Sequence, residues 1–332
     1  MKEIYIAELG KHENQQIVGY FAATSKSLRS RKGGGQYLAL TLGDRSGQIE
    51  CRMWDKLSDS LGSFEAGDVV KVRGEVGRYN GHLQITLDKV RRAAAEEFDP
   101  ADYLPQSSQD VEGLWRRLND SVESFTDPHL KALVRSFLDD PDLAEALRHA
   151  PAAKSMHHAW LGGLLEHIVS LLGICGMAAQ HYPAIHRDLL LTGAILHDIG
   201  KLQELRWSTA FDYTLAGQLV GHITLGVAMI EKKLADLPDF PPELRILVEH
   251  IVVSHHGKLE FGSPKLPMIP EAVLLHYLDD LDAKMHVMQS EFARNEAAGR
   301  PGAEMTEWVR AMERPLLNTE AFLKAKPPPD EG

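Results

Sequence analysis

The spacing of apolar residues changes once along this 332-residue chain, and the change limits what the chain can fold into. From Gln16 to about Arg92 apolar and polar residues alternate, which is typical of half-buried β-strands. From Asp110 onward the apolar residues recur with a helical period. We therefore predict a multidomain protein with one domain of strands and one of helices. At roughly 150 residues per domain, the length of the chain also favours two domains.

Five segments of the first part alternate strongly enough to be strands, with turn residues between them: 16–24, 36–42, 48–54, 68–79 and 82–90. A short helix is expected near Lys56 to Leu61, and the first residues, from Met1 to Glu3, lead into a strand-like segment. Five strands with a helix after the third is the order of an OB-fold, a small Greek-key barrel that binds oligonucleotides. Residues 1–92 are therefore predicted to form a small all-β OB-fold barrel.

The second part is predicted to be an all-α helical bundle with almost no strand signal, and its helices begin or break at Asp127-Pro128 and Asp140-Pro141. An acidic, proline-containing segment from Ala93 to Ser108 indicates a linker between the two parts. We assign residues 93–150 to the linker and leading helices, and residues 151–314 to the main helical domain. Residues 315–332 form a C-terminal tail that is expected to fray.

The net charge of −11 is unevenly distributed along the chain. Residues 1–95 carry 15 Lys and Arg against 11 Asp and Glu, whereas the remaining residues carry 21 against 36. The first segment can approach a polyanion, but the second would need a bound cation to do so. Because there is no uninterrupted apolar stretch of about 18 residues and no signal peptide, we expect a cytoplasmic protein with no membrane segment. The two cysteines, Cys51 and Cys175, do not form a CxxC zinc pattern.

Four cations lie between the first two predicted strands and are followed by three glycines: Lys26, Arg29, Arg31 and Lys32. A basic loop on an OB-fold can wrap a phosphate backbone, so we predict that these four residues bind nucleic acid. The alternative is a solvated hairpin tip without a ligand. Tyr37, Trp54 and Tyr79 are candidates for stacking on bases, but in so small a barrel we expect each of them to belong to the core.

Histidines and aspartates interrupt the apolar helical segments of the second part, in this order: His167, His197, Asp198, His222, His255, His256, Asp279 and Asp282. A single buried histidine is usually a core residue, but burying this many ionisable groups is costly without the charge compensation that a divalent cation supplies. The adjacent pair His197-Asp198 can direct an imidazole and a bridging carboxylate toward two metals, which together hold a hydroxide and the oxygens of a phosphoester. Ligands of these types favour Mn²⁺, Fe or Zn²⁺.

The order of a histidine, a His-Asp pair and a distant aspartate on helices resembles the HD superfamily of metal-dependent phosphohydrolases. Longer strings make this resemblance more specific: Gly162–His167, Gly193–Lys201, Gly217–Ile223, and Ser254–Gly257 followed by Glu260–Pro264. Together with an N-terminal OB-fold, these strings resemble the YhaM group of 3′-to-5′ exoribonucleases over residues 5–290.

The resemblance implies four primary metal ligands, with Asp198 as the bridge between two metals: His167, His197, Asp198 and Asp279. His222 and one or both of His255 and His256 match the additional ligands of superfamily members that hold two metals. The expected cofactor is therefore a pair of divalent cations per chain, with Mn²⁺ favoured.

Four further residues are assigned supporting roles at the same site. Lys201 is predicted to act in catalysis by neutralising a phosphate oxygen or the leaving group, and its alternative role is that of a cation at a helix C-terminus. Asp282 lies three residues after Asp279 and is expected to orient a ligand. His157 and His158 are expected to contact the substrate.

The implied function is removal of nucleotides one at a time from the 3′ end of single-stranded RNA, releasing 5′-mononucleotides. The sequence leaves open whether single-stranded DNA is also a substrate and whether the protein is a homo-oligomer. One alternative is an HD phosphohydrolase acting on small or cyclic nucleotides, although the Gly-Tyr-Pro string of enzymes that cleave cyclic dinucleotides does not follow His256. The other is a nucleic-acid-binding protein with a structural metal, which the open His-Asp ligand set counts against.

Overall fold

The computed structural model describes residues 2–31, 34–55, 62–79, 81–99, 102–104, 107, 109–154, 160–207, 211–297 and 302–325. The chain divides into two compact units. Unit 1 comprises residues 1–108, 160–162 and 205–214, and unit 2 comprises residues 109–159, 163–204 and 215–332.

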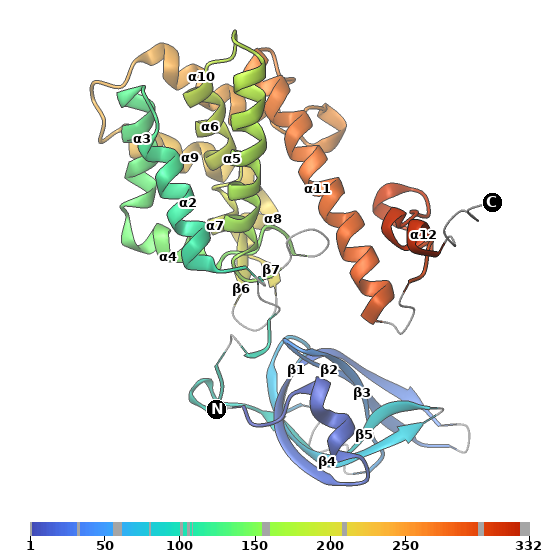
Figure 1. The fold of residues 1–332 in the computed structure, drawn as a ribbon. Coiled ribbons are helices and arrows are strands. Elements are labelled where there is room, and N and C mark those ends of the chain that lie inside the picture. The colour runs from blue at the N-terminus through green and yellow to red at the C-terminus, as the bar shows by residue number, and fades with distance from the viewer. Residues whose placement is uncertain are drawn as a thin grey trace, which may run out of the picture. The chain divides into compact units, whose positions relative to one another are not determined.

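Unit 1 is built on five strands that close into a barrel (Figure 1). The strands are β1 (Gln16–Ser30), β2 (Gln36–Asp44), β3 (Gly47–Met53), β4 (Val69–Tyr79) and β5 (His82–Arg92). Their order around the barrel is β1-β2-β3-β5-β4, and β4 pairs back with β1. β3 and β5 run parallel, whereas the other pairs are antiparallel. This order confirms the predicted OB-fold.

Alternation along the strands divides the side chains between the core and the surface of the barrel. On β2, Leu38, Leu40 and Leu42 are buried, whereas the residues between them are partly exposed. Gly74 lies where β4 shifts its register against β5. A Cβ at this position would lie 2.4 Å from the carbonyl oxygen of Thr86, so the two strands can approach this closely only because residue 74 is a glycine.

Several parts of unit 1 differ from the sequence prediction. β1 continues to Ser30 instead of ending at Thr24, so most of the predicted basic loop pairs with β2 as a hairpin. The hydrogen bonds of an antiparallel pair stabilise this extension relative to a solvated loop. The segment after Glu3 was expected to be strand-like, but it forms a 3₁₀-helix, η1 (Ile6–His12). A second 3₁₀-helix, η2 (Ala95–Glu97), follows β5. The predicted helix at 56–61 lies outside the described residues.

Unit 2 is built from helices (Figure 1). The α-helices in its described residues are α2 (Val111–Glu123), α3 (Pro128–Leu138), α4 (Pro141–His149), α5 (Gly163–His181), α6 (Arg187–Leu196), α7 (Lys201–Glu204), α8 (Leu215–Val220), α9 (His222–Leu234), α10 (Pro242–Ser254), α11 (Pro270–Ala297) and α12 (Thr319–Ala325). Two 3₁₀ turns, η4 (Leu259–Phe261) and η5 (Arg310–Met312), lie before and after α11 in the chain. Asp127 and Asp140 cap α3 and α4, and each is followed by proline at the first helical position, as the sequence predicts.

α5 is the central helix of unit 2, where it packs against α2, α4, α6 and α11. Of the helices in the described part of the chain, only α5 is long and apolar enough to cross a membrane, and 56% of its most apolar stretch is buried inside the structure. Packing inside the unit therefore accounts for much of its apolar character.

Three elements after Asp110 were not expected from the sequence. β6 (Leu205–Trp207) and β7 (Phe211–Tyr213) form a small antiparallel hairpin that belongs to unit 1, in a segment rich in residues that favour strands. α12 lies in the range that was assigned to the C-terminal tail, where apolar residues at helical spacing allow a helix to form.

Candidate metal centre

The predicted ligands lie on or directly after five helices: His167 in α5, His197 and Asp198 after α6, His222 at the start of α9, His255 and His256 after α10, and Asp279 in α11. The two adjacent pairs occur where a helix ends, because the chain turns there and both side chains can enter one site. The fold brings these residues, which are spread over more than one hundred positions, into one place.

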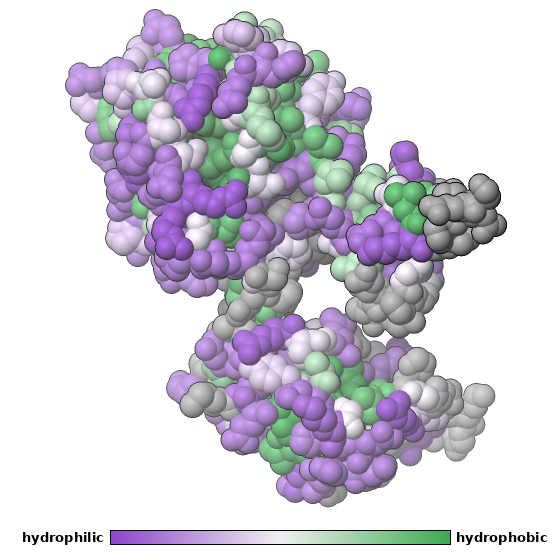
Figure 2. Space-filling model, in the orientation of Figure 1, coloured by the Kyte–Doolittle hydropathy of each residue, from purple (hydrophilic) through white to green (hydrophobic). Residues whose placement is uncertain are grey.

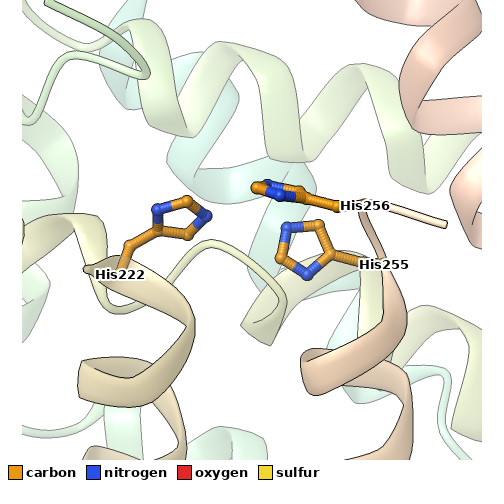
Figure 3. Close-up of side chains that lie close together, drawn as sticks. All are labelled: His222, His255 and His256. Carbon is orange, nitrogen blue, oxygen red and sulfur yellow. The ribbon is translucent and has the colours of Figure 1, made fainter. Parts of the chain in front are cut away.

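Six of the ligands form two groups, and within each group the candidate ligand atoms all lie within 4.8 Å of one another. Group A consists of His167, His197 and Asp279. Group B consists of His222, His255 and His256, whose rings lie close together in Figure 3. Each group combines residues from at least two helices, so neither could form without the tertiary structure.

Asp198 lies between the two groups. Its Oδ2 atom is 3.3 Å from Nε2 of His197 in group A. Its Oδ1 atom is 3.5 Å from Nε2 of His222 and 3.8 Å from Nε2 of His255, both in group B. The two carboxylate oxygens therefore face different groups, which is the arrangement that a carboxylate bridging two cations requires.

The five histidines share one hydrogen-bonding pattern, in which Nδ1 faces an oxygen acceptor. The acceptors are Asp282 Oδ2 for His167 at 2.9 Å, the Ala194 carbonyl for His197 at 3.1 Å, Glu204 Oε1 for His222 at 3.1 Å, the Val252 carbonyl for His255 at 2.7 Å and the Phe261 carbonyl for His256 at 2.8 Å. Because these oxygens accept, Nδ1 is the donor nitrogen of each ring, and Nε2 is the nitrogen that is available to a metal.

The fit of a cation can be judged from a polar atom that the protein leaves unsatisfied. Nε2 of His222 is buried and has no hydrogen-bond partner among the described residues. Buried polar atoms are normally paired, so this nitrogen points to a missing ligand. Group A offers two imidazoles and the Asp279 carboxylate, and group B offers three imidazoles. Divalent transition metals accept both kinds of ligand, and the site therefore fits a divalent metal.

Burial and the neighbouring carboxylates shift the pKa of His167 in opposite directions. Burial disfavours the charged ring, but hydrogen bonds to Asp279 and Asp282 outweigh it and raise the pKa of His167 to about 9. Burial likewise disfavours the ionised form of Asp279, but His167 and His197 hold the pKa of that carboxyl well below its usual value. Without a cation, the proton on His167 supplies the positive charge that a bound metal would otherwise supply.

Glu204 is a site residue that the sequence prediction missed. Its buried carboxylate accepts hydrogen bonds from the backbone N–H of His222 at 2.9 Å and from the ring Nδ1 of the same residue at 3.1 Å. Both bonds hold the ring with Nε2 directed toward Asp198. A sequence signal existed, because Glu204 is an acidic residue directly before the apolar Leu205, three positions after Lys201.

Lys201 is the first residue of α7, a helix of only four residues. Its Nζ atom is 2.6 Å from Oδ2 of Asp198. Gly200 makes this turn fit against α9, since a Cβ there would lie 1.9 Å from the carbonyl oxygen of His222. A pocket of about 290 Å³ opens over the site, and it is lined by Asp198, Lys201, His255, His256, Phe261, His276, Asp279, Asp280 and Ala283.

The remaining predicted residues of the metal site fall in different places. Asp282 is buried, accepts from His167 Nδ1, and also accepts from the hydroxyl of Ser170. It therefore contacts a ligand histidine through the nitrogen that faces away from the metal position. His157 and His158 lie outside the described residues.

None of the three aromatic residues that were expected in the barrel core is buried there, and Tyr37 and Trp54 are partly exposed. Tyr37 and Trp54 stack, with ring centroids 4.7 Å apart, and Tyr79 is 55% exposed. Arg31 lies over the Trp54 ring at 4.9 Å, and Arg52 lies over the Tyr79 ring at 4.9 Å. These five residues, here called the stacking surface, point outward because they alternate with the buried positions of their strands or lie at strand ends.

The four basic residues that were predicted to bind nucleic acid differ in what they contact. Arg29 is exposed on β1. Arg31 donates to the carbonyl of Trp54. Lys26 is largely buried, and its ammonium bonds the carbonyl of Phe64 and lies 3.4 Å from the Glu65 carboxylate, so it is already engaged within the barrel. Lys32 lies outside the described residues.

The fold and the site together define a metal-dependent phosphohydrolase with an N-terminal nucleic-acid-binding barrel. Family models agree with this class: the HD domain matches residues 164–284, and the OB-fold nucleic acid binding domain matches residues 21–93. The chain is 36% identical over 325 residues to the 3′-5′ exoribonuclease YhaM of Bacillus subtilis strain 168, covering 97% of this chain and 99% of that protein. It therefore belongs to the YhaM family of 3′-5′ exoribonucleases.

Two further proteins are similar to this chain, one over most of its length and the other over the barrel. The 3′-5′ exoribonuclease YhaM of Bacillus velezensis is 36% identical over 313 residues, which are 94% of this chain and 96% of that protein. The second OB-fold domain of replication protein A from Methanococcus maripaludis is 27% identical, covers 24% of this chain and 85% of that chain, and has a TM-score of 0.21. The strand order and the family model over residues 21–93 identify the barrel as an OB-fold.

Proposed function

We propose that this protein holds two divalent cations, with Mn²⁺ favoured over Fe or Zn²⁺, and removes nucleotides one at a time from the 3′ end of single-stranded RNA. The observation that carries the proposal is the position of Asp198, whose two oxygens face two separate histidine groups beside an open pocket. Bound there, a pair of cations would activate a water molecule and neutralise the oxygens of a phosphodiester. A purely structural metal would not need an adjacent pocket.

The protein's own residues have distinct tasks in this mechanism. Lys201 lies beside the bridging position, where its ammonium can neutralise charge that develops on a phosphate oxygen or on the departing 3′ oxygen. Glu204 and Asp282 hold the rings of His222 and His167 so that each Nε2 faces the site. These contacts orient the ligands before the substrate arrives.

The stacking surface on unit 1 is the proposed contact for the rest of the RNA. Aromatic rings bind unpaired bases regardless of sequence, which suits a nuclease that must accept every base. Arg29, which is exposed on β1, and Arg31, which lies over the Trp54 ring, are the proposed contacts for phosphates between those bases. Stacking does not read the 2′-hydroxyl, so single-stranded DNA is an expected second ligand.

A time course on end-labelled RNA tests the proposal. With Mn²⁺, 5′-labelled single-stranded RNA should shorten in single-nucleotide steps, and 3′-labelled RNA should release a labelled 5′-mononucleotide at once. A circular form of the same RNA should survive. Equal loss of the circular and linear forms would show internal cleavage and overturn the exonuclease proposal.

A further inference from the structure

We propose that Phe261 is the binding platform for the base of the 3′-terminal nucleotide, at the rim of the pocket over the metal site. The proposal rests on the proposed function, because it places the end of the strand in this pocket. Phe261 lines the pocket together with Asp198, Lys201 and His256. Phe261 is 59% exposed, so its ring is open to a ligand that enters the pocket.

One hydrogen bond links this ring to the metal site. Nδ1 of His256 donates to the backbone carbonyl of Phe261 at 2.8 Å. This bond leaves Nε2 of His256 available to group B, of which His256 is a member. The same bond fixes the backbone that carries the phenylalanine ring. The side chain of His256 therefore links group B directly to the backbone of the platform.

The segment from Gly257 to Gly262 is held in place by further contacts. Gly257 has a positive φ and packs against α11, where a Cβ would lie 2.2 Å from the ring of His276. The N–H of Phe261 donates to the carbonyl of Lys258 at 3.1 Å, and the N–H of Gly262 donates to the carbonyl of Leu259 at 3.0 Å. A ring that is exposed on such a constrained backbone can bind a ligand without a large loss of entropy.

The chemistry of the platform suits a base of any identity. A phenyl ring has no hydrogen-bonding group, so it stacks on a base without reading its edges. The ammonium of Lys258 lies 5.2 Å from the ring centroid, which adds a positive charge near the place where a nucleotide phosphate would enter. The pocket is thus expected to favour ends that carry a base over ends that carry only a ribose.

Binding of two small ligands tests this preference without depending on RNA degradation. The probes are 5′-AMP and ribose 5-phosphate, which share the phosphate and differ in the base, titrated into the full-length Mn²⁺ protein by calorimetry. We expect 5′-AMP to bind roughly tenfold more tightly to the wild type. Phe261→Ala and Phe261→Leu should bring the two affinities to within about twofold, whereas Phe261→Trp should retain the preference.

The control is Tyr182→Ala, which removes a ring that is 52% exposed and follows the far end of α5, fifteen residues after His167. This variant should keep the full preference for 5′-AMP. A preference that is absent in the wild type, or that persists in both Phe261→Ala and Phe261→Leu, would overturn the proposal.

A second measurement connects the platform to the reaction. On RNA with a normal 3′ end, Phe261→Ala should lower kcat/KM roughly tenfold, and on the same RNA with an abasic 3′ nucleotide it should change kcat/KM by less than about twofold. Equal losses on both substrates would contradict a base platform. If the wild type does not shorten RNA from its 3′ end, the proposed exonuclease function fails, and calorimetry still decides whether the pocket binds a base on Phe261.

Discussion

Glu204 and His222 are joined by two hydrogen bonds, because the buried carboxylate accepts from both the backbone N–H and the ring Nδ1 of the histidine. The first bond fixes the start of α9 and the second fixes the rotation of the ring. His222 consequently presents an Nε2 atom that lies 3.5 Å from Oδ1 of Asp198 and has no hydrogen-bond partner in the described part of the chain. Glu204 thus positions one histidine of group B without belonging to that group.

Replacing Glu204 by alanine should weaken the binding of one of the two proposed cations by about 10- to 100-fold, because the ring of His222 loses its orienting acceptor. Glu204→Gln keeps an acceptor oxygen, so its affinity for the cation should fall less. Calorimetric titration of the metal-free protein with Mn²⁺ measures both sites. The control is Glu243→Ala, an exposed position in the first turn of α10. An unchanged isotherm for Glu204→Ala would show that this carboxylate does not position His222.

Asp198→Ala should abolish RNA hydrolysis, with a loss of about a thousandfold or more, because one residue serves both histidine groups. The helical content should stay near that of the wild type, since Asp198 lies after the end of α6. RNA degradation assays, circular dichroism and metal analysis of the purified protein check these expectations. Asp236→Ala, an exposed aspartate of the same unit, is the matched control. Full activity of Asp198→Ala, with no metal in the wild type, would refute the metal centre.

Trp54→Ala should lower the affinity for single-stranded RNA by about 5- to 100-fold, because the Tyr37 ring loses its stacking partner and one base loses its platform. Fluorescence anisotropy in EDTA measures binding without degradation. Trp308→Ala is the control, since this tryptophan of unit 2 is 67% exposed and lies outside the stacking surface. The same affinity in both variants would mean that RNA does not bind through Trp54.

The stability of unit 2 should depend on pH through Asp188. This buried carboxylate accepts from the backbone N–H of Thr126 at 2.6 Å and of Asp127 at 2.9 Å. Burial opposes its ionisation, but these bonds outweigh burial and lower the pKa of Asp188 below its usual value. The folded state therefore binds fewer protons than the unfolded state, so the stabilisation is present above the unfolded pKa of about 3.9 and is lost as the pH falls through the folded pKa.

Asp188→Asn should accordingly reduce the free energy of unfolding at pH 7 by about 1–3 kcal/mol, because an amide is a weaker acceptor for the same donors. The difference from the wild type should shrink as the pH falls below about 4. Urea denaturation at a series of pH values measures both effects. A deficit that stays constant down to the lowest pH would show that ionisation of Asp188 does not contribute.

Local patterns in the sequence were sufficient to predict the two fold classes and to identify the candidate ligands along the chain. Alternation marks strands because side chains change face at every residue, and Asp-Pro marks the starts of α3 and α4 because the aspartate caps free N–H groups. The adjacent pairs His197-Asp198 and His255-His256 stand out because polar neighbours rarely follow a buried helix. Each of these signals acts within a few residues.

Only the tertiary structure decided how those residues combine. The separation of the histidines into groups A and B, the two directions in which Asp198 points and the pairing of Glu204 with His222 all join residues from different helices. The outward position of Tyr37 and Trp54 likewise depends on which side of each strand faces the barrel interior, a choice that burial of Leu38 and Met53 makes. Contacts between distant segments depend on how whole elements pack, and the spacing of residues within one segment carries no information about that packing.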